Sequence, residues 1–396
     1  MPGSTERNRI LLVTLLVQAI NTWSMLAIAA VAPQVAEKLG VGAVLIGYQI
    51  ALIYGVAAVT SVFAGGWVAR WGALRVCQTS LVTSALGVAM AASGHLSLIV
   101  LASMVIGVGY GIINPASSHL LFSRTSPSDR SLVFSIKQTG VPLGGVLAGI
   151  ITPMLSLVMG WQLAVLAVMP LALILAVAVQ PLRTRWDADR SGKPVAAMRI
   201  AQGAVLVWSN PTLRALSLAA FMLAAIQLSL SGFVVAFAVT ELTLGPVLAG
   251  SLLASVQIAG AFSRLLLGWG ADRIQDNGKI LMLAGGLSAL GCIGFFLLTP
   301  ATPLPAVYAI TLLFGIGAIG WNGVFLAEVA RQAEPGRIGA ITGLAGVMTF
   351  AGVVVGPPLF VLLQQAFGSY SSAYLVFALP ALGSMAVVAW SRKRIA

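Results

Sequence analysis

The chain alternates long apolar stretches with short polar ones over its whole length. The apolar stretches cover residues 10–32, 44–69, 75–94, 97–122, 132–156, 161–181, 213–239, 246–270, 279–299, 304–330, 338–366 and 370–391. A helix rises about 1.5 Å per residue, so about 20 residues are enough to cross the roughly 30 Å hydrocarbon core of a bilayer. The pattern therefore predicts an all-α integral membrane protein with twelve transmembrane helices.

One pattern of two apolar helices around a polar turn occurs twice. Five residues of the first copy recur at a constant offset in the second, where Gly107, Gly109, Asn114, Pro127 and Gly144 become Gly315, Gly317, Asn322, Pro335 and Gly352. An internal repeat of long period indicates two copies of one structural unit. We therefore expect two six-helix bundles, residues 1–182 and 213–396, joined by a central cytoplasmic loop at residues 183–212.

The composition agrees with a membrane protein. Hydrophobic residues make up 59% of the chain and charged residues 8%, whereas a soluble domain has about 25% charged residues. The two cysteines, Cys77 and Cys292, lie in apolar stretches and show neither a disulfide framework nor a metal-ligand spacing. We expect no bound metal and no cofactor.

The basic residues fall in alternate loops. The loops on one side, with both chain ends, contain Arg7, Arg9, Arg70, Arg75, Arg124, Arg130, the segment 183–214, Arg273, Lys279, Arg331, Arg337, Arg392, Lys393 and Arg394. The loops on the other side contain one basic residue, Lys38. The positive-inside rule then predicts that both termini and the central loop are cytoplasmic. The net charge of +12 is spread over many short loops, so we expect no nucleic-acid partner. We expect the protein to lie in the plasma membrane, the inner membrane of a bacterium.

Two loops carry related sequences. The loop after the second span reads GGWVARWGALR (65–75), and the loop after the eighth span reads GWGADR (268–273). Both loops resemble the G-x-x-x-D-R-x-G signature that the major facilitator superfamily has between spans two and three. The twelve spans, the two repeats and the central basic loop also resemble this superfamily. The resemblance covers essentially the whole chain. It implies two bundles related by a pseudo-two-fold axis and secondary transport by alternating access.

The acidic residue of this signature is present only in the second copy, as Asp272 beside Arg273. In the first copy Ala69 occupies that position, beside Arg70. An acidic side chain at a helix end can bridge to neighbouring spans and hold one closed arrangement, so we expect the second half to carry more of this latch. We interpret Glu328, near the cytoplasmic end of span ten, as the partner of Arg273. The alternative role for Glu328 is that of a proton carrier.

Two basic residues fall well inside predicted spans, Lys137 in span five and Arg264 in span eight. An ionised group in hydrocarbon costs several kcal/mol unless it finds a partner or a water-filled cavity. In the family that the chain resembles, spans five and eight face each other between the bundles, which implies one shared cavity. At about 8 Å and an effective dielectric near 20 the two cations would repel each other by roughly 2 kcal/mol, and a bound anion would relieve this repulsion. The alternative is that both side chains snorkel to the cytoplasmic interface.

The segment QIAGAFSRLLLG (257–268) of span eight also resembles the corresponding region of monocarboxylate porters. In those porters an arginine about four residues before the signature glycine engages the substrate carboxylate. The resemblance implies this role for Arg264, whose planar guanidinium matches the two oxygens of a carboxylate.

Neutral polar and aromatic side chains on several spans are further candidates for the substrate site. They are Gln18 and Asn21 on span one, Tyr54 on span two, Tyr110 and Asn114 on span four, Gln227 on span seven, Gln257 on span eight, and Trp321 and Asn322 on span ten. Transporters of this architecture bind substrate near the midplane, between the repeats. The alternative for Asn114 and Asn322 is a hydrogen bond between helices.

The sequence shows no phosphate-binding loop, no nucleophile elbow and no paired carboxylates within spans. We therefore expect no enzymatic activity. The predicted function is that of a secondary transporter, a monomer in the lipid bilayer, which moves a small organic anion, a carboxylate, with a co-transported proton as a further candidate partner. The alternatives are a multidrug efflux antiporter of the same fold and a membrane receptor that does not transport.

Overall fold

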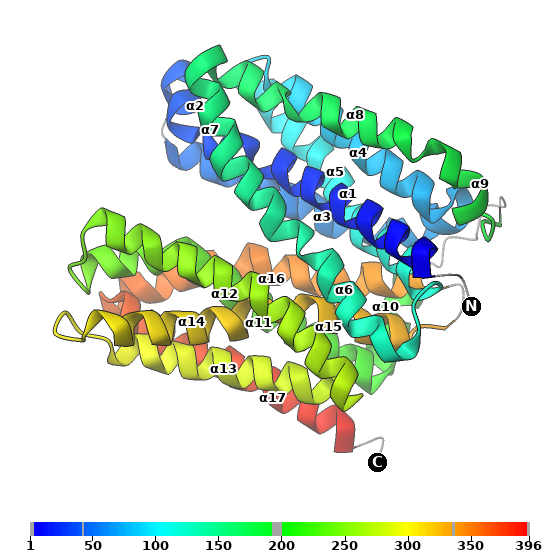
Figure 1. The fold of residues 1–396 in the computed structure, drawn as a ribbon. Coiled ribbons are helices and arrows are strands. Elements are labelled where there is room, and N and C mark those ends of the chain that lie inside the picture. The colour runs from blue at the N-terminus through cyan, green and yellow to red at the C-terminus, as the bar shows by residue number, and fades with distance from the viewer. Residues whose placement is uncertain (1–3, 42, 192–199, 335–336, 394–396) are drawn as a thin grey trace. The chain divides into compact units, whose positions relative to one another are not determined.

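The computed structural model describes residues 4–41, 43–191, 200–334 and 337–393 (Figure 1). These residues form α-helices and two short 3-10 helices, and no strand occurs among them. Twelve of the helical segments are long and apolar enough to span a membrane. The predicted all-α fold and the predicted number of spans are thus confirmed.

The first half supplies spans one to six. They are formed by α1 (Ser4–Ala30), α3 (Ala43–Trp71), α4 (Ala73–Ala91), α5 (Leu96–Phe122), the consecutive helices α6 (Arg130–Gln138) and α7 (Gly140–Leu166), and α8 (Val168–Ala178). Short helices connect them: α2 (Ala32–Leu39), η1 (Pro127–Asp129), η2 (Gln180–Leu182) and α9 (Arg183–Trp186). Span five is interrupted at Thr139, between α6 and α7. A second interruption falls inside α7 at Gly160, whose φ of 78° suits a residue without a Cβ. The predicted boundary between the fifth and sixth apolar stretches lies at this glycine.

The second half supplies spans seven to twelve. They are formed by α11 (Pro211–Thr240), α12 (Pro246–Ile274), α13 (Asn277–Leu297), the consecutive helices α14 (Leu304–Gly320) and α15 (Asn322–Gln332), α16 (Ile338–Phe367) and α17 (Tyr370–Lys393), after the short α10 (Ile200–Ser209). The start of α11 follows from local chemistry, because Asn210 Oδ1 accepts from the backbone of Thr212 and Leu213, and Pro211 occupies the first turn.

The chain divides into two compact units. Unit 1 comprises Met1–Thr125, Lys137–Leu206 and Ala333–Val347, and unit 2 comprises Ser126–Ile136, Val207–Gln332 and Met348–Ala396. Each unit therefore contains most of one half and a short piece of the other. The piece in unit 2 contains η1 and most of α6, and the piece in unit 1 contains the start of α16.

In unit 1, α1 and α7 pack backbone against backbone. A Cβ added at Gly144 would lie 2.3 Å from the carbonyl oxygen of Ala19, a distance that no side chain can occupy. Close approach of this kind is typical of membrane helices, which have no hydrophobic driving force between them and pack through small residues. Farther along the same pair, Trp23 Nε1 donates to Thr152 Oγ1 at 2.9 Å.

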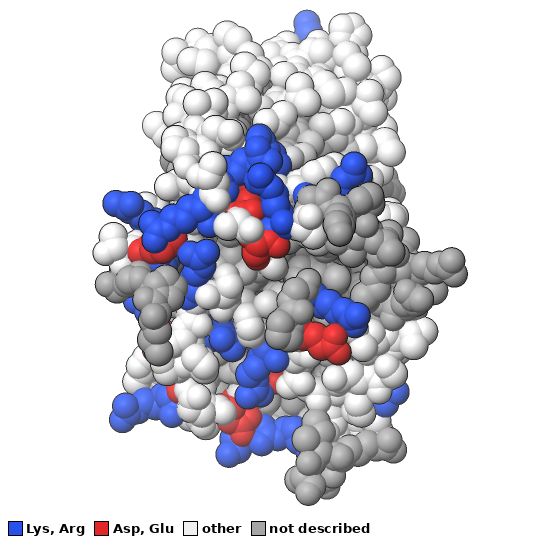
Figure 2. Space-filling view, turned by 90° about the vertical axis from the view of Figure 1, so that its right-hand side faces the viewer, with Lys and Arg blue, Asp and Glu red and all other residues white. Residues whose placement is uncertain are grey.

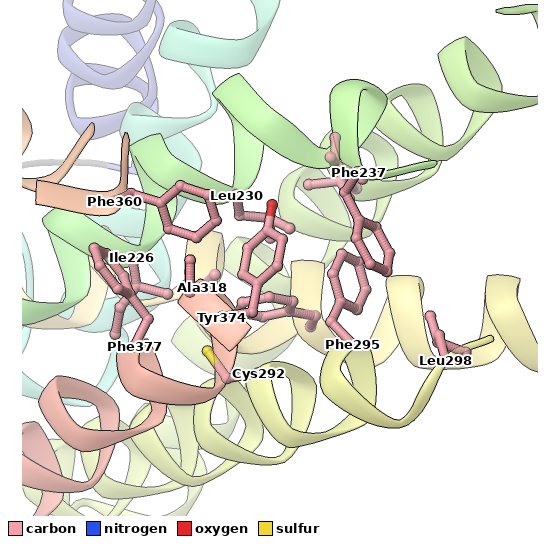
Figure 3. Packing of buried hydrophobic residues seen from close by; sticks show 14 of the residues in the cluster. Ile226, Leu230, Phe237, Cys292, Phe295, Leu298, Ala318, Phe360, Tyr374 and Phe377 are labelled. Carbon is pink, nitrogen blue, oxygen red and sulfur yellow. The ribbon is translucent and has the colours of Figure 1, made fainter. Parts of the chain in front are cut away.

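Unit 2 has an aromatic core around Tyr374 of α17 (Figure 3). The ring of Tyr374 lies 4.6 Å from that of Phe360, 5.0 Å from that of Phe295 and 5.8 Å from that of Phe237. Ring pairs at these separations contribute about 0.5–1.5 kcal/mol each beyond the burial of their area. The Tyr374 hydroxyl, which points toward Leu230 in Figure 3, is buried and has no hydrogen-bond partner among the described residues.

The face shown in Figure 2 carries Lys and Arg side chains interspersed with a smaller number of Asp and Glu side chains. The alternation of basic and non-basic loops in the sequence predicts such a face. The assignment of this face to the cytoplasm stays a prediction.

Candidate functional site

Lys137 lies in the last turn of α6, two residues before the interruption of span five, and only 1% of its surface is exposed. Its ammonium donates to Gln18 Oε1 at 2.9 Å, to Asn114 Oδ1 at 2.5 Å and to Gln138 Oε1 at 3.1 Å. Three neutral amide oxygens from three helices thus match the three N–H groups of an ammonium. These charge-assisted bonds offset part of the cost of burying the charge. The side chain and its three partners all lie inside unit 1.

Arg264 lies on α12 in unit 2, and 2% of its surface is exposed. Its Nε donates to the carbonyl oxygen of Ile319 at 3.3 Å, just before the interruption between α14 and α15. The preceding carbonyl, that of Ala318, accepts from Trp321 Nε1 at 3.0 Å. Side chains thus bind two carbonyl groups at the broken end of α14, which also carries the negative end of that helix's dipole.

The interruption of span ten also positions a pair of amide side chains. Asn322 begins α15, and its Nδ2 donates to Gln227 Oε1 of α11 at 3.1 Å. Both side chains are half-buried, whereas the neighbouring Trp321 is buried and packs edge-on against Phe325.

The other predicted site residues differ in their surroundings. Asn21 is buried and connects α1 to α4, because its Oδ1 accepts from Ser80 Oγ at 2.8 Å and from Ser84 Oγ at 2.9 Å. Tyr54 and Tyr110 are buried and pack edge-on with ring centroids 5.6 Å apart. These contacts make Asn21 a residue that joins helices. A role for the three residues in substrate binding stays a prediction.

The structure thus brings Lys137 to Asn114 and Gln18 in unit 1, and groups Arg264, Trp321, Asn322 and Gln227 around one interruption in unit 2. Gln257, on α12, is exposed. Each unit is described by itself, so the expectation that Lys137 and Arg264 share one cavity stays a prediction.

Gln138 is a contact of Lys137 that the sequence did not reveal. Adjacent residues of a continuous helix do not face each other. The contact forms where α6 ends at Gln138, just before the interruption at Thr139.

Asp272, the acidic residue of the second signature, caps α6. Its Oδ1 accepts from the backbone N–H of Ser131 at 2.9 Å, and its Oδ2 accepts from that of Leu132 at 2.7 Å. A carboxylate at a helix N-terminus binds N–H groups that have no partner within the helix and interacts favourably with the helix dipole. The side chain therefore holds the start of α6 within unit 2.

The predicted pairing of Glu328 with Arg273 is wrong. The Glu328 carboxylate is buried and binds Arg331 through two bonds of 2.8 and 2.9 Å, and it accepts from Asn277 Nδ2 at 2.9 Å. Arg331 follows Glu328 by three residues on one helix face, so it reaches the carboxylate locally. Arg273 and Arg70 are exposed and form no ion pair with any residue that the structure describes.

Acidic side chains also anchor helix ends outside the spans. In unit 1, Asp187 accepts from the backbone N–H groups of Leu74 and Arg75 at 2.7 and 3.1 Å, and burial raises its pKa above the usual value. In unit 2, Asp276 binds Arg392 at 2.5 and 2.7 Å, and this bond lowers the pKa of Asp276 to about 2.

Twelve spans, buried cations and polar groups at helix interruptions are features of a membrane transporter. Residues 14–357 match the family model described as Major Facilitator Superfamily, and the chain belongs to this superfamily. The hexuronate transporter of Bacillus subtilis (strain 168) is 25% identical over 177 residues, which are 44% of this chain and 42% of that protein. Monocarboxylate transporter 11 of Mus musculus is 28% identical over 134 residues, 32% of this chain and 30% of that protein.

These two matches span less than half the length of either relative. Among solved structures, the human organic anion transporter MFSD10 (TETRAN) superposes with a TM-score of 0.78 at 16% identity, covering 96% of this chain and 99% of that chain. A likeness at this identity confirms the transporter fold and says nothing of the substrate.

Proposed function

We propose that this protein is a secondary active transporter that moves a small organic anion, a carboxylate, across the membrane by alternating access. The observation that carries the proposal is the pair of buried cations, Lys137 and Arg264. Among the lysines and arginines that the structure describes, these two are the buried ones, and each unit contains one of them. Buried ionisable groups in spans are expensive and mark substrate or ion pathways.

The two cations also lie where spans are interrupted. Lys137 lies two residues before Thr139, where span five is interrupted between α6 and α7. Arg264 binds a backbone carbonyl at the end of α14, where span ten is interrupted. Interrupted helices form the substrate sites of many secondary transporters, because backbone polar groups are released there. The names of the relatives, a hexuronate transporter and a monocarboxylate transporter, support a carboxylate as the carried anion.

In this proposal the two cations have different roles. The guanidinium of Arg264 binds both oxygens of the carboxylate, which suits its planar fork of donors. The ammonium of Lys137 contributes a positive charge from unit 1. Neutral side chains, Asn114 and Asn322 among them, determine which anions fit.

Release of α6 from Asp272 accompanies the change of access. The transporter works as a monomer in a bacterial inner membrane with both termini in the cytoplasm.

The experiment is a thermal-shift screen of mono- and dicarboxylates with the purified protein, followed by counterflow of the best anion in proteoliposomes. Lys137→Ala and Arg264→Ala should each abolish the anion-dependent rise in melting temperature. Arg273→Ala, which removes an exposed arginine, is the control and should retain it. Full stabilisation in both test variants would contradict the site. Counterflow of lipophilic cations that survives Lys137→Ala would indicate a drug antiporter instead.

A further inference from the structure

The amide pair of unit 2 offers hydrogen-bonding groups that no described residue uses. Asn322 Nδ2 donates to Gln227 Oε1, and this is the hydrogen bond that the two side chains make. Asn322 Oδ1 remains as an acceptor, and Gln227 Nε2 remains as a donor. Both side chains are half-buried, and these two atoms do not belong to the buried atoms that lack a partner. Part of each side chain is therefore exposed.

The depth of this pair in the spans favours water over lipid as its surroundings. Gln227 lies near the middle of α11, and Asn322 lies about ten residues, or about 15 Å, from the end of its span. An unpaired amide group that faces hydrocarbon at this depth would cost several kcal/mol. Polar groups at such positions face the interior of a bundle or a water-filled cavity, where substrates pass.

The same interruption carries the cation that binds the carboxylate in the proposed function. Arg264 Nε bonds to Ile319, and Asn322 follows Ile319 by three residues, about 4.5 Å along a helix axis. Arg264 of α12 and Gln227 of α11 thus both bind residues of the broken span α14–α15 within unit 2. In the proposed function, a small ligand held by Arg264 through its carboxylate would have a substituent near that carboxylate on the same part of the broken span as Asn322.

We propose that the carried carboxylate bears a hydroxyl group near its carboxylate, and that Gln227 and Asn322 recognise this hydroxyl. A hydroxyl both donates and accepts, so it can donate to Asn322 Oδ1 and accept from Gln227 Nε2. An alkyl carboxylate of the same size would displace water from both amide groups without replacing their hydrogen bonds, and sites of this kind reject such analogues. The inference rests on the proposed function and names the substrate class within it, the hydroxycarboxylates.

The oxygens of the corresponding amides of unit 1 already bind a cation. Gln18 Oε1 and Asn114 Oδ1 both accept from the Lys137 ammonium. Gln18 Nε2 is buried. Recognition of the hydroxyl is therefore assigned to unit 2 alone.

The test compares two acids that differ by one hydroxyl, lactate and propionate, by binding to the purified full-length protein and by counterflow in proteoliposomes. The unaltered protein should bind lactate at least about tenfold more tightly than propionate. In Gln227→Met and in Asn322→Leu this ratio should fall to near one, because the affinity for lactate falls more than the affinity for propionate. The ratio is insensitive to a partial loss of folded protein, because the same sample binds both acids.

Gln18→Met is the matched control in unit 1, since it removes the same amide from a contact with the cation. It should weaken the binding of both acids equally and preserve the ratio of their affinities. Equal binding of lactate and propionate by the unaltered protein, or a ratio that survives both unit 2 variants, would overturn the hydroxyl assignment and leave carboxylate transport intact. A folded protein that binds neither acid nor any other carboxylate would instead defeat the proposed function.

Discussion

The two units contain related amide pairs that serve different purposes. In unit 1, Gln18 of the first span and Asn114 of the fourth both point their oxygens at Lys137. In unit 2, Gln227 and Asn322, on the corresponding spans of the second half, bond directly to each other. A pair of glutamine and asparagine is thus kept in both copies of the repeat, and an ammonium is inserted into one of them.

The positions of the charges show how the repeat became asymmetric. At the offset that relates Asn114 to Asn322, Lys137 corresponds to Ala345. At the offset that relates the signature glycines Gly65 and Gly268, Arg264 corresponds to Ser61. Each cation thus has a small neutral residue as its counterpart. A single position in each half therefore decides where the charge lies, while the helices around it keep the same plan.

The two copies of the signature differ in the same manner. In unit 2 the Asp272 carboxylate caps the start of α6. In unit 1 the start of α16 packs closely on α3, since a Cβ added at Gly65 would lie 2.3 Å from Ala340 Cα. The Asp272 cap has no counterpart from the first signature, because Ala69 occupies the position of the acid.

The largest expected effect comes from making unit 1 resemble unit 2. Lys137→Ala removes the ammonium and leaves Gln18 and Asn114 free to bond to each other, as their counterparts do. We expect anion affinity to fall by about 100-fold, since hydrogen bonds to a charged group contribute about 1.5–3 kcal/mol. The melting temperature of the anion-free protein should change little. Titration with the best anion and a thermal melt of the same sample measure the two quantities.

Lys38→Ala serves as the control for this change, because Lys38 is exposed on α2. It should alter neither quantity. A loss of binding that merely follows a collapse of the melting temperature would show that the lysine supports the fold of unit 1, and the comparison between the two amide pairs would lose its functional meaning.

The next effect concerns the cap on α6. Asp272→Ala should speed hydrogen exchange at the amides of Ser131 and Leu132 by about tenfold, because a side-chain cap contributes about 0.5–2 kcal/mol. The reverse change, Ala69→Asp, should slow exchange at the start of α16, where the cap is absent. Exchange followed by mass spectrometry of peptides from both helix starts tests the pair. Unchanged exchange in Asp272→Ala would mean that close packing dominates at both signatures.

A smaller effect concerns the carboxylates that anchor helix ends outside the spans, Asp276 in unit 2 and Asp187 in unit 1, whose contributions to stability depend differently on pH. Arg392 lowers the pKa of Asp276 to about 2, so the stability that this pair contributes is present above about pH 4 and is lost as the pH falls through 2. Asp276→Asn should lower the stability of unit 2 by about 1 kcal/mol at pH 7, a value reduced for the exposure of both side chains. The gap in melting temperature from the unaltered protein should stay constant from pH 7 to pH 5.

The pKa of Asp187 in unit 1 is shifted in the opposite direction. Burial raises its pKa, so its ionised form is less favoured in the folded state, and its contribution to stability falls as the pH rises through that raised value. Melting temperatures in a pH series distinguish the two junctions. A gap for Asp276→Asn that closes already near pH 6 would show that the Arg392 contact does not control this carboxylate.

The sequence predicted the parts of the structure that depend on bilayer thickness and local chemistry. The twelve spans follow from apolar lengths that match the hydrocarbon core. The pairing of Glu328 with Arg331 could also have been predicted, because Arg331 follows Glu328 by three residues on one helix. The cap of Asp272 on α6 was not, since it joins residues about 140 positions apart, and only the folded unit 2 brings them together.

The smallest expected effect tests the aromatic core, which distinguishes unit 2 from unit 1. At the repeat offset, Phe314 and Phe360 correspond to Ile106 and Thr152, so the rings are particular to the second half. The Tyr374 hydroxyl lies among them without a partner in the described part of the chain. Tyr374→Phe should therefore stabilise unit 2 by up to about 1 kcal/mol, because it removes a buried polar group that has no hydrogen bond.

Tyr308→Phe is the matched control with the opposite sign. The Tyr308 hydroxyl is hydrogen-bonded to Ser251 Oγ, so its loss should lower the melting temperature. Thermal melts of both variants in the same detergent give the comparison. If Tyr374→Phe lowers the melting temperature as much as Tyr308→Phe does, then the Tyr374 hydroxyl is bonded in solution, most simply to a buried water molecule, and the core of unit 2 is a polar site lined by rings rather than a purely apolar one.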